Sequence, residues 1–183
     1  MNPTAIKYEA AQRPLTAVIE ALPAQSWASP SPCEGWSACD VLRHLIDTQR
    51  DYLTGHNIDL GGMPDIDTDP VAAWRGHAKR VMEAIADDAV PASAFDGHFG
   101  PTTVGDTLEQ FYVWDMLVHR WDIATSHGAQ AAFSDAELDQ IQRGADKFGA
   151  ALYMDGVCRP SVTAPENADR EVRLLARLGR RAG

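Results

Sequence analysis

The segment that most constrains the fold is 111–122, which contains no Gly or Pro and repeats apolar residues at three- and four-residue steps. This pattern predicts an α-helix. At about 100° per residue, Asp115, His119 and Asp122 project within about 60° of one another. A carboxylate and an imidazole one turn apart are suited to bind one metal ion. The alternative is a hydrogen-bonded core histidine beside an acid-lined helix edge, and this segment alone leaves both interpretations open.

Helical periodicity recurs along the rest of the chain, whereas the strand signal is weak. The helices that we expect cover 4–22 (broken by Pro14), 38–53, 71–87, 104–127 as the longest, 135–154 and 167–178. Ser37 with Asp40, Asp69 with Pro70, and Ser134 are good helix starts. Segment 94–99 is the one short extended piece that we expect. Long helices joined by moderate loops predict the all-α class and a helical bundle.

Length and charge narrow the class of protein. With 183 residues, we expect one domain spanning 1–183. The net charge of −10 argues against nucleic acid and anionic membranes as partners. The only basic cluster, 170–181, is interpreted as the solvated side of a last helix. No apolar run long enough to span a membrane and no signal peptide are visible, and the three cysteines lack metal-ligand spacing, so we expect a cytoplasmic protein.

A third ligand candidate lies in the second predicted helix. His44 falls at the edge of the apolar face that contains Val41 and Leu45. An antiparallel bundle can bring this helix beside 104–127, so that His44 joins Asp115 and His119. Two imidazoles and one carboxylate form a facial set that leaves positions open for water or substrate. Zn²⁺ is our first choice of cofactor, with Ni²⁺, Fe²⁺ and Mn²⁺ also compatible.

Other residues near these positions have two interpretations each. Asp122 is either an outer partner that holds an imidazole N–H or a solvated acid. Trp36, Tyr112 and Trp114 are either pocket-lining aromatics or plain core. Cys33 is either a nucleophile or, more commonly for such residues, an idle thiol.

Two motifs carry a family resemblance. The segment Ser31-Pro32-Cys33-Glu34-Gly35-Trp36-Ser37, followed by Asp40-Val41-Leu42-Arg43-His44-Leu45, resembles a signature of the mycothiol-dependent maleylpyruvate isomerase-like group of actinobacteria. That group belongs to the DinB/YfiT-like metalloenzyme superfamily. Segment 115–124 resembles its second signature, and the tail from Asp155 to Arg180 is also similar to members of the group.

The resemblance implies a DinB-like four-helix bundle with additional short helices and a divalent metal held by His44, Asp115 and His119. These are the positions that spacing had already selected. It also implies a low-molecular-weight thiol such as mycothiol as cosubstrate and a small-molecule substrate, and a homodimer is compatible with the superfamily. The maleylpyruvate isomerases have Glu where this chain has Asp115, and they carry a further C-terminal domain, so we expect a substrate other than maleylpyruvate.

These observations predict a metal-dependent thiol S-transferase or isomerase that acts on a small electrophile. Two alternatives remain open on the sequence. One is a metal-dependent hydrolase that uses no thiol, and the other is a non-catalytic binding or stress-response module.

Overall fold

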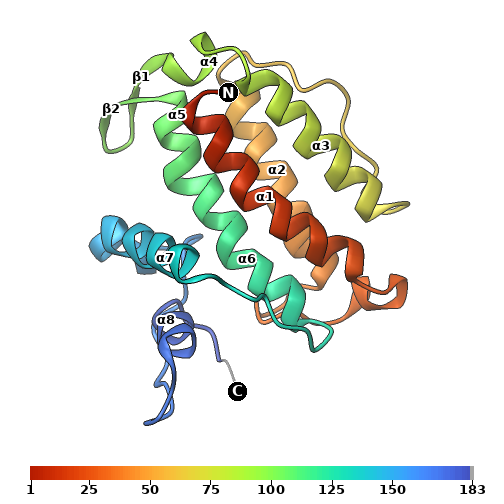
Figure 1. The fold of residues 1–183 in the computed structure, drawn as a ribbon, viewed down its shortest axis with the longest axis vertical. Coiled ribbons are helices and arrows are strands. Elements are labelled where there is room, and N and C mark those ends of the chain that lie inside the picture. The colour runs from red at the N-terminus through yellow and green to blue at the C-terminus, as the bar shows by residue number, and fades with distance from the viewer. Residues whose placement is uncertain (182–183) are drawn as a thin grey trace.

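The computed structural model describes residues 1–181 and is mainly helical (Figure 1). The two residues after these, which complete the predicted domain 1–183, lie outside the described part. The long helices are α1 (Pro3–Ala21), α2 (Ala38–Gly55), α3 (Pro70–Ile85), α6 (Trp114–Thr125), α7 (Asp135–Phe148) and α8 (Arg170–Arg177). The short elements are α4 (Ala89–Ala92), α5 (Val104–Thr107), the π-helical η2 (Leu108–Val113), and the 3-10 turns η1 (Ala24–Ala28) and η3 (Gly149–Tyr153). The predicted all-α class is confirmed.

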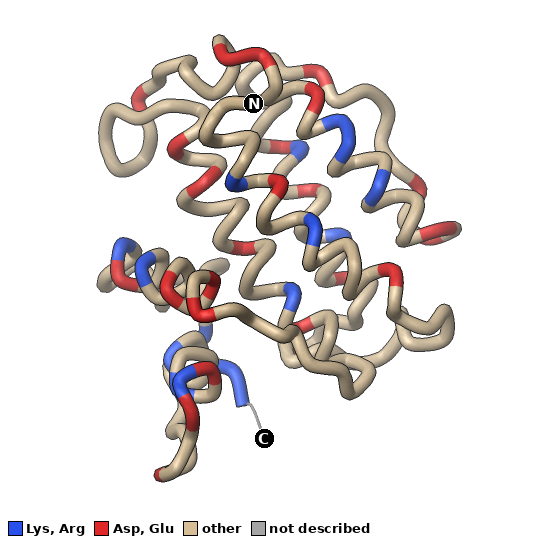
Figure 2. The backbone as a smooth tube through the Cα atoms, in the orientation of Figure 1, with Lys and Arg blue, Asp and Glu red and all other residues tan. Residues whose placement is uncertain are grey.

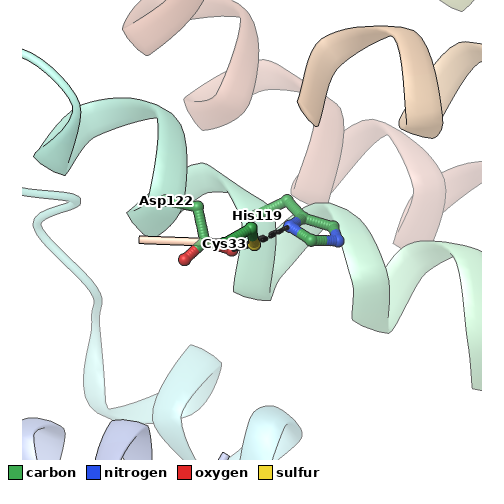
Figure 3. A group of neighbouring side chains, drawn as sticks. All are labelled: Cys33, His119 and Asp122. Carbon is green, nitrogen blue, oxygen red and sulfur yellow. Dashed lines mark hydrogen bonds and ion pairs between the residues drawn. The ribbon is translucent and has the colours of Figure 1, made fainter. Parts of the chain in front are cut away.

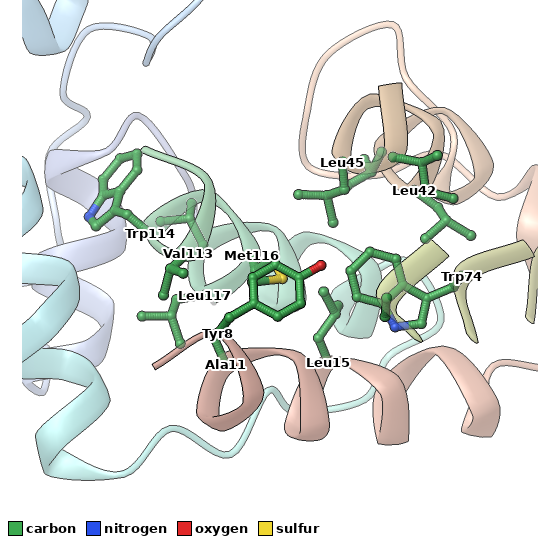
Figure 4. Close-up of a cluster of buried hydrophobic side chains, with 14 of the residues drawn as sticks. Tyr8, Ala11, Leu15, Leu42, Leu45, Trp74, Val113, Trp114, Met116 and Leu117 are labelled. Carbon is green, nitrogen blue, oxygen red and sulfur yellow. The ribbon is translucent and has the colours of Figure 1, made fainter. Parts of the chain in front are cut away.

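Four helical segments pack in a closed ring. Helix α1 contacts α3 on one side and α6 on the other, and α2 contacts the same two helices. Their inner faces form one apolar core, in which Tyr8, Leu15, Leu45, Trp74 and Met116 are all buried (Figure 4). Helices α7 and α8 lie outside this ring, where α7 packs against α6 and α8 packs against α7 (Figure 1). The ring places α2 directly beside α6, as the candidate metal site requires.

Three of the predicted helix starts are present as side-chain caps. Ser37 and Asp40 form a reciprocal capping box at the start of α2, and Ser134 forms another at the start of α7. Asp69 accepts a hydrogen bond from the backbone N–H of Ala72 at the start of α3. These caps satisfy N–H groups that have no partner inside the helix.

The predicted break at Pro14 was wrong, because α1 continues through it. Proline removes one hydrogen bond from a helix interior and costs about 3 kcal/mol in isolation. Here Tyr8 and Ala11 before it and Leu15 and Ile19 after it are buried in the same core. Tertiary packing on both sides therefore holds the helix together across the lost bond.

The predicted extended piece at 94–99 is half of a small hairpin. Strand β1 (Ala94–Gly97) pairs antiparallel with β2 (Gly100–Thr103), with Ala94 opposite Thr103. The second strand was not expected from the sequence, because four residues give too little alternation to read. The hairpin places His98 and Phe99 at its tip.

The long helix expected over 104–127 is interrupted by a π-helical turn. The chain passes from α5 through η2 into α6, which ends at Thr125. A π-turn bonds i to i+5, so it rotates the residues before it relative to those after it, and such turns are frequent at functional sites. This one ends just before Asp115.

The two C-terminal helices are shorter than the periodicity indicates. Helix α7 stops at Phe148 because Gly149 takes a positive φ of 53°, and the remainder of the predicted helix forms η3. Helix α8 begins after its cap, Asp169. Among residues 1–181, no helix is long and apolar enough to cross a membrane.

Helix α7 approaches the ring so closely that it requires a glycine. A Cβ on Gly144 would lie 2.0 Å from Cδ1 of Trp114. The indole cannot move aside freely, because it is 5% exposed and its Nε1–H donates to the carbonyl of Ile141 at 2.9 Å. We therefore predict that Gly144→Ala destabilises the protein by about 1–3 kcal/mol through overpacking.

Gly76, inside α3, provides the matched control in urea unfolding. A Cβ there would meet open space among the described residues. Replacing a helix-interior glycine with alanine at such a position stabilises by about 0.5–1 kcal/mol. Opposite signs for Gly144→Ala and Gly76→Ala are expected, and equal effects would refute the close approach of α7.

A polar network crosses the centre of the ring. The hydroxyl of Tyr8 donates to Oε1 of Gln49 at 2.7 Å, and Nε2 of His77 lies 3.0 Å from the same oxygen. Because that amide oxygen only accepts, Nε2 of His77 carries the proton. Burial, and then repulsion from Arg50, lower the pKa of His77 to about 3.

The low pKa of His77 predicts acid sensitivity. The unfolded chain protonates this histidine below a pKa of about 6.5, while the folded protein does not, so the free energy of unfolding falls as the pH falls. When the pH falls from about 7.5 to about 5, this one group should lower the free energy of unfolding by about 2 kcal/mol. His77→Gln keeps an N–H donor but cannot titrate. Over the same pH interval, we expect this variant to lose about 2 kcal/mol less stability than the unmodified protein, as measured by denaturant titration. An identical pH dependence in both proteins would contradict the assignment.

Candidate metal centre

Three predicted ligands converge from two neighbouring helices. His44 comes from α2, and Asp115 and His119 come from successive turns of α6. Nε2 of His44 lies 3.0 Å from Oδ2 of Asp115, and Nε2 of His119 lies 3.3 Å from Oδ1 of the same carboxylate. One donor atom from each residue lies within 4.8 Å of the others. His44 and Asp115 are each about one-quarter exposed, so the group faces an opening.

The spacing of these donors fits a divalent cation. Two donors bound to one ion at about 2.1 Å lie about 3.0 Å apart at a right angle and about 3.4 Å apart at a tetrahedral angle. The separation of His44 from Oδ2 of Asp115, 3.0 Å, and that of His119 from Oδ1, 3.3 Å, both fall in this range. Two imidazole nitrogens and one carboxylate also form the donor chemistry of open catalytic sites. The residues present therefore suit the metal that the sequence predicts.

Asp122 fixes which nitrogen of His119 is available. Nδ1 of His119 lies 2.7 Å from Oδ2 of Asp122, whose side chain is 0% exposed (Figure 3). A carboxylate only accepts, so Nδ1 carries the proton and Nε2 faces Asp115 and His44. The burial of Asp122 rules out its interpretation as a solvated acid. Its position is the one that an outer partner would take if the imidazole of His119 bound a metal.

Arg180 neutralises this buried carboxylate. Its Nε donates to Oδ1 of Asp122 at 2.8 Å, and its Nη2 donates to Oδ2 at 2.6 Å, in a bidentate pair. Arg180 is itself mostly buried and bonds the carbonyl of Leu178. The tail after α8 therefore completes the support of His119, although it is 58 residues from Asp122 in sequence.

The predicted solvated basic face at 170–181 needs correction at Arg180, which is buried, whereas the ion pairs of its other arginines with α7 are exposed. Arg170 and Arg177 of α8 pair with Asp139 and Asp146 of α7, and Figure 2 shows that both helices carry basic as well as acidic residues. Arg180 turns inward, as described above. Only part of this cluster is a solvated surface.

Cys33 forms a second potential ligand group with His119 and Asp122 (Figure 3). Its thiol donates to Oδ2 of Asp122 at 3.4 Å and lies 4.0 Å from Nδ1 of His119. However, both oxygens of Asp122 already bond Arg180, whose Nη2 is 3.9 Å from the sulfur. A divalent cation there would face the guanidinium charge. Electrostatics therefore favour the group of His44, Asp115 and His119.

Proton affinity in the site is set by the same contacts. Burial raises the pKa of the Asp115 carboxyl, but attraction to and hydrogen bonds from His119 and His44 outweigh it and hold that pKa well below its ordinary value. Burial lowers the pKa of His119, but Asp115 and Asp122 outweigh it and raise that pKa above its ordinary value. The lone pair on Nε2 thus binds either a proton or a cation, so metal affinity should fall as the pH falls.

Two cavities meet at His44 and Asp115. The first has a volume of about 590 Å³ and is lined by polar and charged groups that include Cys33, Glu34, Arg159 and Arg180. Trp36 also lines it, with its ring centroid 5.0 Å from that of His44. The second has a volume of about 370 Å³. Its aromatic lining residues are Phe99, Phe111, Tyr112, Trp114 and Phe148.

The predicted pocket aromatics therefore divide between the two cavities. Trp36 lies in the first, and Tyr112 and Trp114 lie in the second. Trp114 is also core, because its ring is almost fully buried. A loop over 154–157, which the sequence analysis related to the family but did not assign to the site, contributes to both cavities.

The chain is similar to one protein family model and to curated proteins from mycobacteria. Residues 8–55 match the family model of the mycothiol maleylpyruvate isomerase N-terminal domain, a segment that includes His44. Curated relatives are uncharacterized proteins from two strains of Mycobacterium tuberculosis, each 26% identical over 136 residues. The matches cover 62% of this chain and 52% of each relative, so the chain spans about half the length of the curated relatives it matches. No solved structure matches the chain.

These findings confirm the resemblance to the mycothiol-dependent maleylpyruvate isomerase-like group that the two motifs predicted. The family model ties the N-terminal helices to a mycothiol-related family. Asp115 and His119 lie beyond the matched segment, so their assignment rests on the sequence motif and on the geometry above.

Proposed function

We propose that this protein is a metal-dependent enzyme that uses a low-molecular-weight thiol, mycothiol, for S-transfer to a small electrophile or for its isomerisation. The observation that carries the proposal is the convergence of His44, Asp115 and His119 at the edge of two open cavities. A structural metal site would instead be closed on all sides by protein ligands. Membership of the matched segment in a mycothiol-related family supports the choice of thiol.

His44, Asp115 and His119 would hold the ion, with Zn²⁺ as the first choice and Ni²⁺, Fe²⁺ or Mn²⁺ as alternatives. When bound, the cation supplies Lewis acidity that lowers the pKa of a coordinated thiol. Asp122, which Arg180 holds in place, accepts from Nδ1 of His119 and so leaves the lone pair on Nε2 for the ion.

Both reactions balance with thiol and electrophile alone. In S-transfer, the thiol sulfur bonds to the electrophilic carbon, the leaving group departs with its electron pair, and the thiol proton is released. In isomerisation, the sulfur adds to a double bond, rotation follows, and elimination restores the free thiol. Both need two reactants side by side, which two cavities meeting at one site provide.

We also propose a cytoplasmic location. All three cysteines within residues 1–181 are free, as a reducing compartment allows. The thiol of Cys33 faces the first cavity, where an oxidising compartment would expose it to disulfide exchange.

The test is thiol consumption with metal-loaded protein, mycothiol and a panel of small electrophiles. We expect consumption that requires the metal, disappears in His119→Ala and persists in His56→Ala. His56 is the matched control, because it follows the same helix as His44, about 18 Å further along the axis. Product formed without thiol would replace the proposal by metal-assisted hydrolysis. A metal-loaded protein that turns over no substrate would favour a non-catalytic binding module.

A further inference from the structure

The second cavity differs in chemistry from the first. Its wall is a connected set of aromatic rings: Phe111 stacks on Phe99 with centroids 6.2 Å apart and packs edge-on against Phe148 at 5.4 Å. Phe148 in turn contacts Trp114 at 5.2 Å. The cavity is thus an apolar pocket one side of which carries the candidate ligands His44 and Asp115.

Phe99 is the unusual member of this wall. It is 68% exposed, although most large apolar side chains of the chain are buried. The β1–β2 hairpin holds it at its tip, against Phe111. An exposed aromatic at the rim of an apolar pocket is typical of a ligand-binding site.

The charged residues that line the second cavity restrict the kind of ligand that it can bind. Among the described residues that line the second cavity there is no Lys or Arg, whereas Asp115 and Asp155 contribute carboxylates. Away from the end that carries the candidate ligands, an anionic group entering this cavity would lose hydration without gaining a Lys or Arg partner. The basic residues Arg159 and Arg180 lie in the first cavity instead. A polar lining and an apolar lining therefore lie on two sides of the same candidate ligands.

We propose that the second cavity binds an uncharged aromatic group of the electrophile, while the first accepts the polar thiol. This rests on the proposed function for the identity of the second reactant. The volume of about 370 Å³ is ample for such a group, since an apolar cavity of about 150 Å³ is known to bind benzene. Phe99 and Phe111 act as specificity-determining residues that stack on its ring.

Binding is tested first, without thiol or turnover. The probes are benzyl alcohol and para-(hydroxymethyl)benzoate, which share a ring and differ in charge, with affinity followed by NMR titration. We expect benzyl alcohol to bind at least about tenfold more tightly than the anion. Phe99→Ser should weaken it about three- to tenfold, and because Phe99 is exposed this variant should fold. Met63→Ser, which removes a similarly exposed apolar side chain outside the cavity, should have no effect.

Turnover is tested separately with benzyl chloride and para-(chloromethyl)benzoate. Mycothiol sulfur would bond to the benzylic carbon, chloride would leave with the electron pair, and the thiol proton would be released. We expect kcat/KM to favour the neutral compound by at least about tenfold, with that preference reduced in Phe99→Ser.

The outcomes separate the two proposals. Equal affinity or equal kcat/KM for neutral and anionic compounds, unchanged in Phe99→Ser, would overturn the aromatic site while leaving thiol chemistry intact. Selective binding of benzyl alcohol without any thiol consumption would support the site and refute the proposed reaction.

Discussion

His119→Ala should weaken the binding of Zn²⁺ by at least about 100-fold, beyond the 10- to 100-fold that loss of an outer partner typically costs. His119 supplies one of three protein donors, and its Nε2 is the one that Asp122 and Arg180 orient. The alanine leaves Asp115 and His44 with a two-donor set that no longer encloses an ion. Competition with a chelating indicator at constant pH measures the affinity.

The control for this experiment is His56→Ala, which removes an imidazole from the distal end of α2. Its Zn²⁺ affinity should match that of the unmodified protein. If His119→Ala also retains full affinity while the protein stays folded, the ion binds elsewhere and the ligand assignment is wrong.

Arg180→Met should lower the free energy of unfolding by about 3–5 kcal/mol, because it leaves the buried carboxylate of Asp122 without its cation. The same variant should reduce Zn²⁺ affinity about 10- to 100-fold through the loosened His119 ring. Denaturant unfolding and metal titration measure the two effects. Arg177→Met is the matched control: its pair with Asp146 is exposed, and such pairs contribute about 0–1 kcal/mol.

A second substitution tests whether Arg180 stabilises the protein through its charge or through the packing of its side chain. In the double variant with Asp122→Asn, the buried negative charge is gone, so removal of Arg180 should cost much less than in the single variant. A coupling energy of 0.5–3 kcal/mol is usual for residues in direct contact. Additive effects of the two substitutions would show that Arg180 does not stabilise the carboxylate.

Local sequence patterns predicted the parts of the site that depend on helix geometry. Asp115, His119 and Asp122 share one face because of helical spacing alone, and the capping box at Ser37 fixes the start of the helix that carries His44. Pairing these two helices required only the assumption of a bundle. The three predicted ligands accordingly come together.

The remaining parts depend on contacts that no local pattern encodes. Arg180 sits in a basic cluster that resembles a solvated helix, and its partner Asp122 is 58 residues away. The π-turn before Asp115 has no periodicity of its own over six residues. Pro14 predicts a break that tertiary packing prevents. The role of Phe99 becomes visible only once the hairpin has placed it beside Phe111.

The nature of the ligands is tested most directly by X-ray absorption spectroscopy of the protein loaded with one equivalent of Zn²⁺. We predict a shell of nitrogen and oxygen at about 2.0–2.1 Å, including two imidazoles, with no sulfur. Sulfur at about 2.3 Å would place the ion at Cys33, and a shell without imidazole would contradict the proposed centre altogether.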